Sequence, residues 1–157
     1  MAQHQLMLLV FSVVVVGISL LLGITTYTED QKKSERDSAN LALIDLAGKA
    51  IAYRRTPASM NGGTDANGIS SFEGFTMDAI GAKPREGDGG GYDLLGDGSC
   101  FTGHATPDGS QFKAAWYPNG DCDTSNNIVL NMTIAGDNIE SVTISEGGFA
   151  NEWRRGE

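Results

Sequence analysis

The chain opens with a long uninterrupted apolar stretch. The nineteen residues from Leu6 to Ile24 carry no charge, and Ser12 and Ser19 are their only hydroxyl side chains. As a helix rising ~1.5 Å per residue, this stretch would be ~28 Å long, about the thickness of the hydrocarbon core of a bilayer. A buried helix of a soluble protein normally shows a polar stripe, and this stretch has none. The pattern therefore predicts a helix that spans a membrane or packs inside an apolar assembly.

The same helix is predicted to continue well beyond the apolar stretch. No proline occurs before Pro57, and the residue before a proline avoids the α region, so the helix should end near residue 55. From Ala39 onward, apolar residues recur at helical spacing. They are Ala39, Leu43, Leu46, Ala50 and Tyr53, flanked by Ile44, Ala47 and Ile51. An amphipathic helix must cover something, and the simplest candidate is a sheet formed by the rest of the chain.

The region after the helix is first rich in glycine. Residues 56–98 hold eleven glycines and two prolines, a composition typical of turns and loops. We expect four apolar side chains to hold this region against the core, namely Phe72, Phe75, Met77 and Ile80. We expect residues 83–91 to form a second, exposed loop.

Alternating apolar and polar residues predict strands in the remainder of the chain. The clearest runs are residues 112–116, 128–134 and 142–144, with a shorter strand at 99–104. The Ala-Gly-Asp-Asn sequence of residues 135–138 suits a hairpin turn between the last two. An antiparallel sheet of about four strands, covered on its apolar face by the long helix, makes the fold α+β. The chain then divides into a hydrophobic N-terminal helix (1–27), its amphipathic continuation (28–55), and a Gly-rich loop with a globular antiparallel β-sheet region (56–157).

Charge is distributed as unevenly as hydrophobicity. The chain has 11 Lys and Arg against 20 Asp and Glu, a net charge of -9. Residues 1–28 hold none of these, residues 29–55 hold five acids and six bases, and residues 56–157 hold fifteen acids and five bases. Binding nucleic acid through bulk charge requires a basic face, so the sequence argues against a nucleic-acid partner.

The sequence offers no constellation for catalysis. Its two histidines, His4 and His104, lie in different regions, and Gly89-Gly90-Gly91 is not followed by the Lys-Ser/Thr of a phosphate-binding loop. We therefore expect neither an enzyme nor a cofactor. Asp121, Asp123 and Ser125 are spaced like the start of a calcium loop, but they lack its glycine and its terminal glutamate, so a polar turn is the simpler interpretation.

The two cysteines and one asparagine were considered as modification sites. Cys100 and Cys122 do not form a C-x-x-C motif, and an even pair in an exported protein suggests one disulfide, with two free buried thiols as the alternative. The bridge would close a loop of about twenty residues and contribute ~3 kcal/mol to stability. Asn131-Met132-Thr133 fits a glycosylation sequon but lies within a predicted strand.

The N-terminal organisation resembles that of type IV pilins over residues 1–55. Mature members of that family begin with a short polar stub, followed by an apolar run and an amphipathic helix that leads into a globular head. The resemblance implies that a leader peptide precedes Met1 and that Met1 is the processed, methylated N-terminal residue. It also implies assembly through the hydrophobic helix, by side chains that include Leu6, Leu9, Val10, Phe11, Val13, Val14, Val16, Ile18, Leu21 and Leu22.

Two features depart from that family pattern. Most bacterial pilins carry a glutamate at the fifth mature position, thought to pair with the N-terminal amine of a neighbour, whereas this chain has Gln5. The usual proline in the second half of the apolar run is also absent. An amide accepts a hydrogen bond but supplies no charge, so we expect association to depend on close apolar packing rather than on one ionic register.

The resemblance implies a structural role as the major subunit of an extracellular type IV pilus-like filament. The partners would be further copies of the chain in a helical homopolymer at the cell surface, and an assembly machinery at the inner membrane, where the unassembled subunit would reside. A pseudopilin of a type II-like secretion system remains an alternative. So does a single-span membrane protein with an acidic, ligand-binding head. A signal peptide is disfavoured because the sequence shows no basic n-region and no small-x-small cleavage site.

Overall fold

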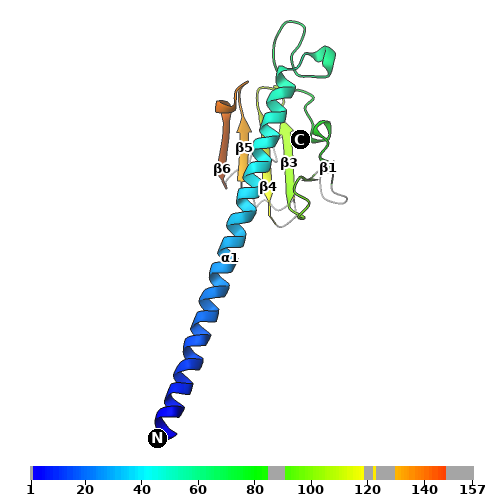
Figure 1. The fold of residues 1–157 in the computed structure, drawn as a ribbon. Coiled ribbons are helices and arrows are strands. Elements are labelled where there is room, and N and C mark those ends of the chain that lie inside the picture. The colour runs from blue at the N-terminus through cyan, green and yellow to red at the C-terminus, as the bar shows by residue number, and fades with distance from the viewer. Residues whose placement is uncertain (1, 85–90, 119–121, 123–129, 148–157) are drawn as a thin grey trace. The chain divides into compact units, whose positions relative to one another are not determined.

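A computed structural model of the chain describes residues 2–84, 91–118, 122 and 130–147, with side chains from residue 7 onward. The α-helix α1 (Ala2–Arg55) begins the chain and is continuous, as predicted (Figure 1). It ends where Thr56 precedes Pro57. By its internal contacts the chain forms two compact units, one ending at Arg36 and the other beginning at Asp37. We call the second unit, residues 37–157, the head.

Six strands of the described chain form one antiparallel sheet in the head, with each strand beside the next one in sequence. They are β1 (Lys83–Pro84), β2 (Tyr92–Asp93), β3 (Cys100–Ala105), β4 (Phe112–Tyr117), β5 (Leu130–Ile134) and β6 (Val142–Glu146). Among the described residues, the short 3-10 helices η1 (Ala58–Met60) and η2 (Met77–Ile80) lie between α1 and β1, and η3 (Ile139–Ser141) lies between β5 and β6. The predicted α+β fold is confirmed.

The four predicted strands correspond to β3–β6, and the sheet has two strands more than expected. The exposed loop expected at residues 83–91 is wrong at both ends, because Lys83 and Pro84 form β1 and Gly91 is buried. β1 pairs with β2 through Lys83 with Asp93 and Pro84 with Tyr92. A strand of two residues is too short to show alternation, so its pairing is visible only in three dimensions.

One face of the sheet carries the core. The register places Phe101, Trp116 and Leu130 side by side across β3–β5, and Ala114 beside Met132 in the next row. The residues of α1 that cover this face are buried, namely Ala39, Leu43, Leu46, Ala47, Ala50 and Ile51. The predicted stripe is therefore correct except at Ile44, which is 47% exposed and belongs to the outward side of the helix.

The Gly-rich segment is held to this core as predicted. Phe72, Phe75 and Met77 are buried, and Ile80 packs partly buried against them. The ring of Phe75 lies between Tyr53 of α1 and Phe112 of β4, at centroid distances of 5.1 and 4.8 Å. The hydroxyl of Tyr53 also donates a hydrogen bond of 2.8 Å to the carbonyl of Glu73. These contacts fix the loop although few of its residues are in regular structure.

Two arginines at the end of α1 contact the turn between β5 and β6. The Nε atom of Arg54 lies 2.8 Å from Oδ1 of Asp137, and its guanidinium stacks over the ring of Phe72 at 4.8 Å. Arg55 donates hydrogen bonds to Oδ1 of Asn138, at 2.8 Å, and to the carbonyl of Asp137. Cations are favoured at a helix C-terminus, so Arg54 and Arg55 both suit the helix and connect it to the β5–β6 turn. The turn joins β5 to β6, which pair as predicted, but it is longer than the expected four residues because it includes η3.

Candidate assembly surface

The apolar stretch of α1 is exposed around its whole circumference. An 18-residue window of this helix has a mean hydropathy of 2.8, and none of the window is buried within the chain. Exposure of the large apolar side chains from Met7 to Ile24 ranges from 45% at Val15 to 71% at Met7. The exposed residues include nine of the ten predicted assembly residues: Leu9, Val10, Phe11, Val13, Val14, Val16, Ile18, Leu21 and Leu22. The side chain of Leu6, and the whole of Met1, lie outside the described residues.

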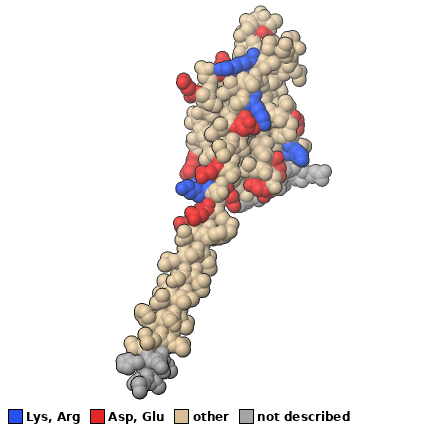
Figure 2. Space-filling model, in the orientation of Figure 1, with Lys and Arg blue, Asp and Glu red and all other residues tan. Residues whose placement is uncertain are grey.

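The hydroxyl groups of this stretch do not make it more polar. The side chain of Ser12 donates to the carbonyl of Leu9, and that of Ser19 to the carbonyl of Val15. Thr25 and Thr28 bond back into the helix in the same way. With these donors satisfied internally, the surface offered to a partner is apolar, and it is free of charge over its whole length (Figure 2). Such a helix has the length and composition to cross a membrane and equally suits close packing against other apolar helices.

Inside the head, α1 also presents an outward side that nothing in the described chain covers. Leu41 is 69% exposed and Ile44 47%, and Gly48 follows on the same side one turn later. Between Gly48 and η3 lies an open hollow of about 550 Å³, lined by Gly48, Ile51, Arg55, Asn138, Ile139 and Glu140. Ile139 is itself 59% exposed, so the hollow has an apolar wall, and its rim carries one acid, Glu140, and one base, Arg55.

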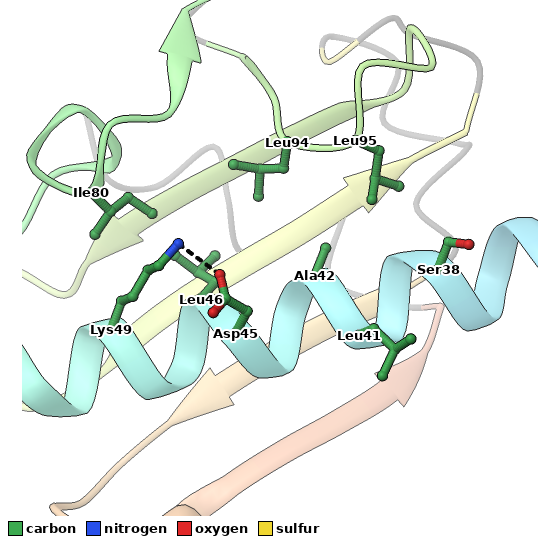
Figure 3. A pocket seen from close by; sticks show the side chains of 9 residues that line it. All are labelled: Ser38, Leu41, Ala42, Asp45, Leu46, Lys49, Ile80, Leu94 and Leu95. Atoms are coloured by element: carbon green, nitrogen blue, oxygen red, sulfur yellow. Dashed lines mark ion pairs between the residues drawn. The ribbon is translucent and has the colours of Figure 1, made fainter.

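A second groove, of about 420 Å³, lies on the other side of the same helix. Leu41, Ala42 and Leu46 of α1 line it together with Ile80 of η2 and with Leu94 and Leu95 from the loop between β2 and β3 (Figure 3). The ion pair between Lys49 and Asp45, at 2.7 Å, lies on the helix at this groove. The sequence analysis did not predict the apolar outward side of α1 at Leu41 and Ile44. A helical projection would have indicated it, because these two residues lie about opposite the buried stripe of Leu43 and Leu46.

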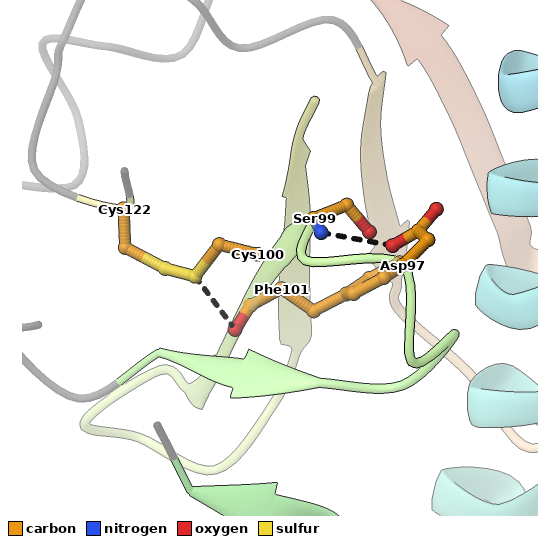
Figure 4. Close-up of a disulfide and its surroundings, with 5 residues drawn as sticks. All are labelled: Asp97, Ser99, Cys100, Phe101 and Cys122. Carbon is orange, nitrogen blue, oxygen red and sulfur yellow. Dashed lines mark hydrogen bonds between the residues drawn. A yellow bond between two sulfur atoms is a disulfide. The ribbon is translucent and has the colours of Figure 1, made fainter. Parts of the chain in front are cut away.

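The two cysteines form the predicted disulfide. It joins Cys100 of β3 to Cys122 with a Cα–Cα distance of 5.7 Å (Figure 4). Cys100 is fully buried and packs with Ala115 and Tyr117 on the sheet face opposite the core. A side chain at Gly91 would overlap both sulfur atoms, which explains the glycine there. The bond attaches Cys122 to the centre of the sheet, and disulfides of this kind are typical of proteins outside reducing compartments.

No catalytic or metal-binding site emerges from the described residues. Within them, no group of three His, Cys, Asp or Glu side chains is close enough to hold a metal ion. The calcium candidates Asp121, Asp123 and Ser125 lie outside the described residues. Asn131 of the sequon is buried in β5, where its amide nitrogen donates to the carbonyl of Gly147 at 2.9 Å, so the folded head does not present it for modification.

The perturbed ionisable groups of the head belong to its architecture. Hydrogen bonds from Thr106 and Ser110 lower the pKa of Asp108 to about 2, and all three residues form the turn between β3 and β4. Burial lowers the pKa of His104, and the neighbouring Lys113 adds to this effect. Burial and the nearby Asp78 raise the pKa of Tyr92. None of these groups lies at the outward side of α1, so the surface there acts through shape, hydrophobicity and rim charge.

Comparisons with protein families, with curated proteins and with solved structures found no significant match. The geometry of the chain itself therefore carries the functional argument. What it establishes is a long apolar N-terminal helix combined with a small, disulfide-bonded antiparallel sheet, an architecture consistent with that of pilins.

Proposed function

We propose that the protein is a structural subunit of an extracellular type IV pilus-like filament, held together by its N-terminal hydrophobic helix. The observation that carries this proposal is the exposure of the entire apolar stretch in a chain whose head already has a complete core. Removing apolar surface from water is favourable by ~25 cal/mol per Å², so residues 7–24 require lipid or other copies of the same helix.

Three further observations support a filament over a simple membrane anchor. The apolar surface of α1 does not end at Ile24 but reappears in the head at Leu41 and Ile44, beyond the reach of a bilayer around residues 7–24. The helix is continuous through Arg55, so both apolar surfaces belong to one element. The disulfide suits an extracytoplasmic head. In this function the subunit is stored in the inner membrane and then assembled into a helical homopolymer.

The test is electron microscopy of cell-surface material with Val15→Asp and the matched control Ser12→Ala. A buried aspartate in the apolar bundle carries an unpaired charge, whereas Ser12 gives up only an internal hydrogen bond. We expect wild-type and Ser12→Ala chains to form long filaments, and Val15→Asp to form none while its purified head unfolds normally. Short filaments confined to the periplasm would instead identify a pseudopilin, and a detergent-bound monomer under all conditions would identify a membrane-anchored protein.

A further inference from the structure

The outward side of α1 in the head has the features of a surface that packs against another helix. Leu41, Ile44 and Gly48 lie within a 60° sector of the helix at 100° per residue, and a side chain at Gly48 would meet open space. Beside Gly48, the hollow toward η3 is bounded by the exposed Ile139 and by Glu140. An absent side chain on one helix lets the backbone of another approach closely. This surface therefore combines apolar contacts, a place for close approach and one acidic residue at a defined height.

The apolar stretch of another copy carries the complementary features. Leu21, Thr25, Thr28 and Lys32 recur at intervals of four, three and four residues, so they share one side of α1. Leu21 is exposed, and the hydroxyl of Thr28 is bonded to the carbonyl of Thr25. That side thus presents an apolar residue, two small residues and then the first base of the chain.

The spacing of these features agrees between the two surfaces. Leu21 and Lys32 are eleven residues apart, ~16 Å along a helix. Eleven residues beyond Leu41 is Ala52, which lies between the two residues, Ile51 and Arg55, that share the hollow with Glu140. Placing Leu21 of one copy beside Leu41 of another therefore sets Thr28 against Gly48 and Lys32 beside Glu140. Arg55 lines the same hollow as Glu140, so the base must lie on the Glu140 side, and the charge of -10 over residues 56–157 favours it there.

We propose that the Leu41–Ile44–Gly48 side of each head binds residues 21–32 of a second copy, parallel to its own α1 and displaced by twenty residues. This inference deepens the proposed function and rests on it. Twenty residues correspond to ~30 Å, so copies in one membrane plane do not make the contact and it forms only when subunits are staggered along a filament. The contact joins two different surfaces, so it repeats without closing and propagates an open helical polymer. An antiparallel helix with the same apolar contact would place Lys32 level with residue 30 and away from Glu140.

Engineered disulfides test the register directly in the full-length chain. In filaments carrying Thr28→Cys with Gly48→Cys, oxidation should produce a ladder of covalent multimers, because each copy then contributes one cysteine to each neighbour. Thr28→Cys with Thr143→Cys is the matched control and should give no ladder, since Thr143 is exposed on the sheet face that α1 does not cover. Dimers from Thr28→Cys alone would indicate unstaggered packing, and cross-linking of Thr28→Cys with Ser34→Cys would indicate antiparallel packing. Either result overturns the proposal.

A charge reversal provides a second, non-covalent test. Glu140→Lys should lower filament yield several-fold, because an exposed ion pair changes an association constant by up to about fivefold. Adding Lys32→Glu should restore the yield, whereas the exposed Glu73→Lys should leave it unchanged. If the wild-type chain forms filaments but the double-cysteine variant gives no ladder and the charge-swapped variant no rescue, the contact is overturned and the proposed function stands. A chain that forms no filaments at all would overturn both.

Discussion

Two leucines on α1, two residues apart, allow folding of the head to be tested separately from the proposed assembly. Leu43 is fully buried against the sheet, and Leu41 is 69% exposed on the opposite side. Replacing either by alanine removes the same three carbon atoms from the same helix. The two variants therefore differ in their surroundings alone, which makes each the control of the other.

The structure gives different magnitudes for the two changes. Three buried carbon groups at ~0.8 kcal/mol each amount to ~2.4 kcal/mol, and the cavity raises the expected loss for Leu43→Ala to about 3–5 kcal/mol. At Leu41 about a third of the side chain is covered, so the loss is ~0.7 kcal/mol or less and is partly offset by the helix propensity of alanine. Leu41→Ala should instead lower filament yield, because Leu41 lies in the proposed contact between copies.

Urea unfolding of the full-length chain in detergent micelles measures the first effect. In a Trp153→Phe background, the buried Trp116 is the only tryptophan and reports on the core beneath α1. Filament yield from cells measures the second effect. Equal losses of unfolding free energy in the two variants would contradict the assignment of the two faces. A Leu41→Ala chain that assembles as well as wild type would contradict a role for the outward face.

Further outcomes are expected at the disulfide, at two glycines, at His104 and at Gln5. Cys100→Ser with Cys122→Ser should lower the free energy of unfolding by about 3 kcal/mol in the same urea assay, since the bond closes a loop of 22 residues. Gly103→Ala should destabilise the head by about 1–3 kcal/mol, because its Cβ would lie 2.8 Å from the Phe112 ring and 2.9 Å from the Met77 sulfur, whereas Gly48→Ala in open space should stabilise it by up to ~1 kcal/mol. His104 has a pKa below its ordinary value of 6.5, so the unfolded chain binds the proton more readily than the folded chain. The contribution of His104 to the free energy of unfolding is therefore fully present above pH 6.5 and falls as the pH drops below it. His104→Gln should remove this pH dependence from the melting temperature measured in thermal melts. Gln5→Glu should leave filament yield unchanged near neutral pH, and a large increase would show that association does depend on an ionic register.

The sequence predicted those elements whose patterns are long compared with their period. The apolar stretch and the stripe from Ala39 to Tyr53 specify one helix of 54 residues, and the runs that became β4–β6 show the two-residue alternation, while β3 was expected only as a shorter strand. β1 and β2 were missed because two residues cannot show a period, and their pairing depends on how the Gly-rich loop folds back. Arg54 and Arg55 likewise contact Asp137 and Asn138, more than eighty positions away, and no local pattern indicates such a contact.

The candidate surface was predictable only in part, for a related reason. Exposure of residues 7–24 follows from their lack of a polar side, which can be read from the sequence alone. The outward position of Ile44 cannot, because apolar residues flank the buried stripe on both sides and only the width of the covering sheet decides which are left out. Leu41 and Ile44 become candidates for an interaction surface only in the structure, where nothing among the described residues covers them and a hollow adjoins them at Gly48.

In the proposed function, the two apolar surfaces of α1 play different parts in assembly. A subunit stored in the inner membrane as proposed would have residues 7–24 surrounded by lipid as apolar as their own side chains, so moving them into a bundle would yield little hydrophobic free energy. The specificity of assembly must therefore come from features that lipid does not satisfy: close packing at small residues, and contacts outside the bilayer. Leu41 and Ile44 are apolar side chains of the head that would remain exposed to water in the membrane-stored subunit. Glu140 of η3 lies beside α1, at the hollow next to Ile51 and Arg55, where a base of another copy could pair with it. In the proposed filament, covering them would add the driving force that the apolar stretch cannot supply, and their spacing would select one stagger among the many that a uniformly apolar helix would accept.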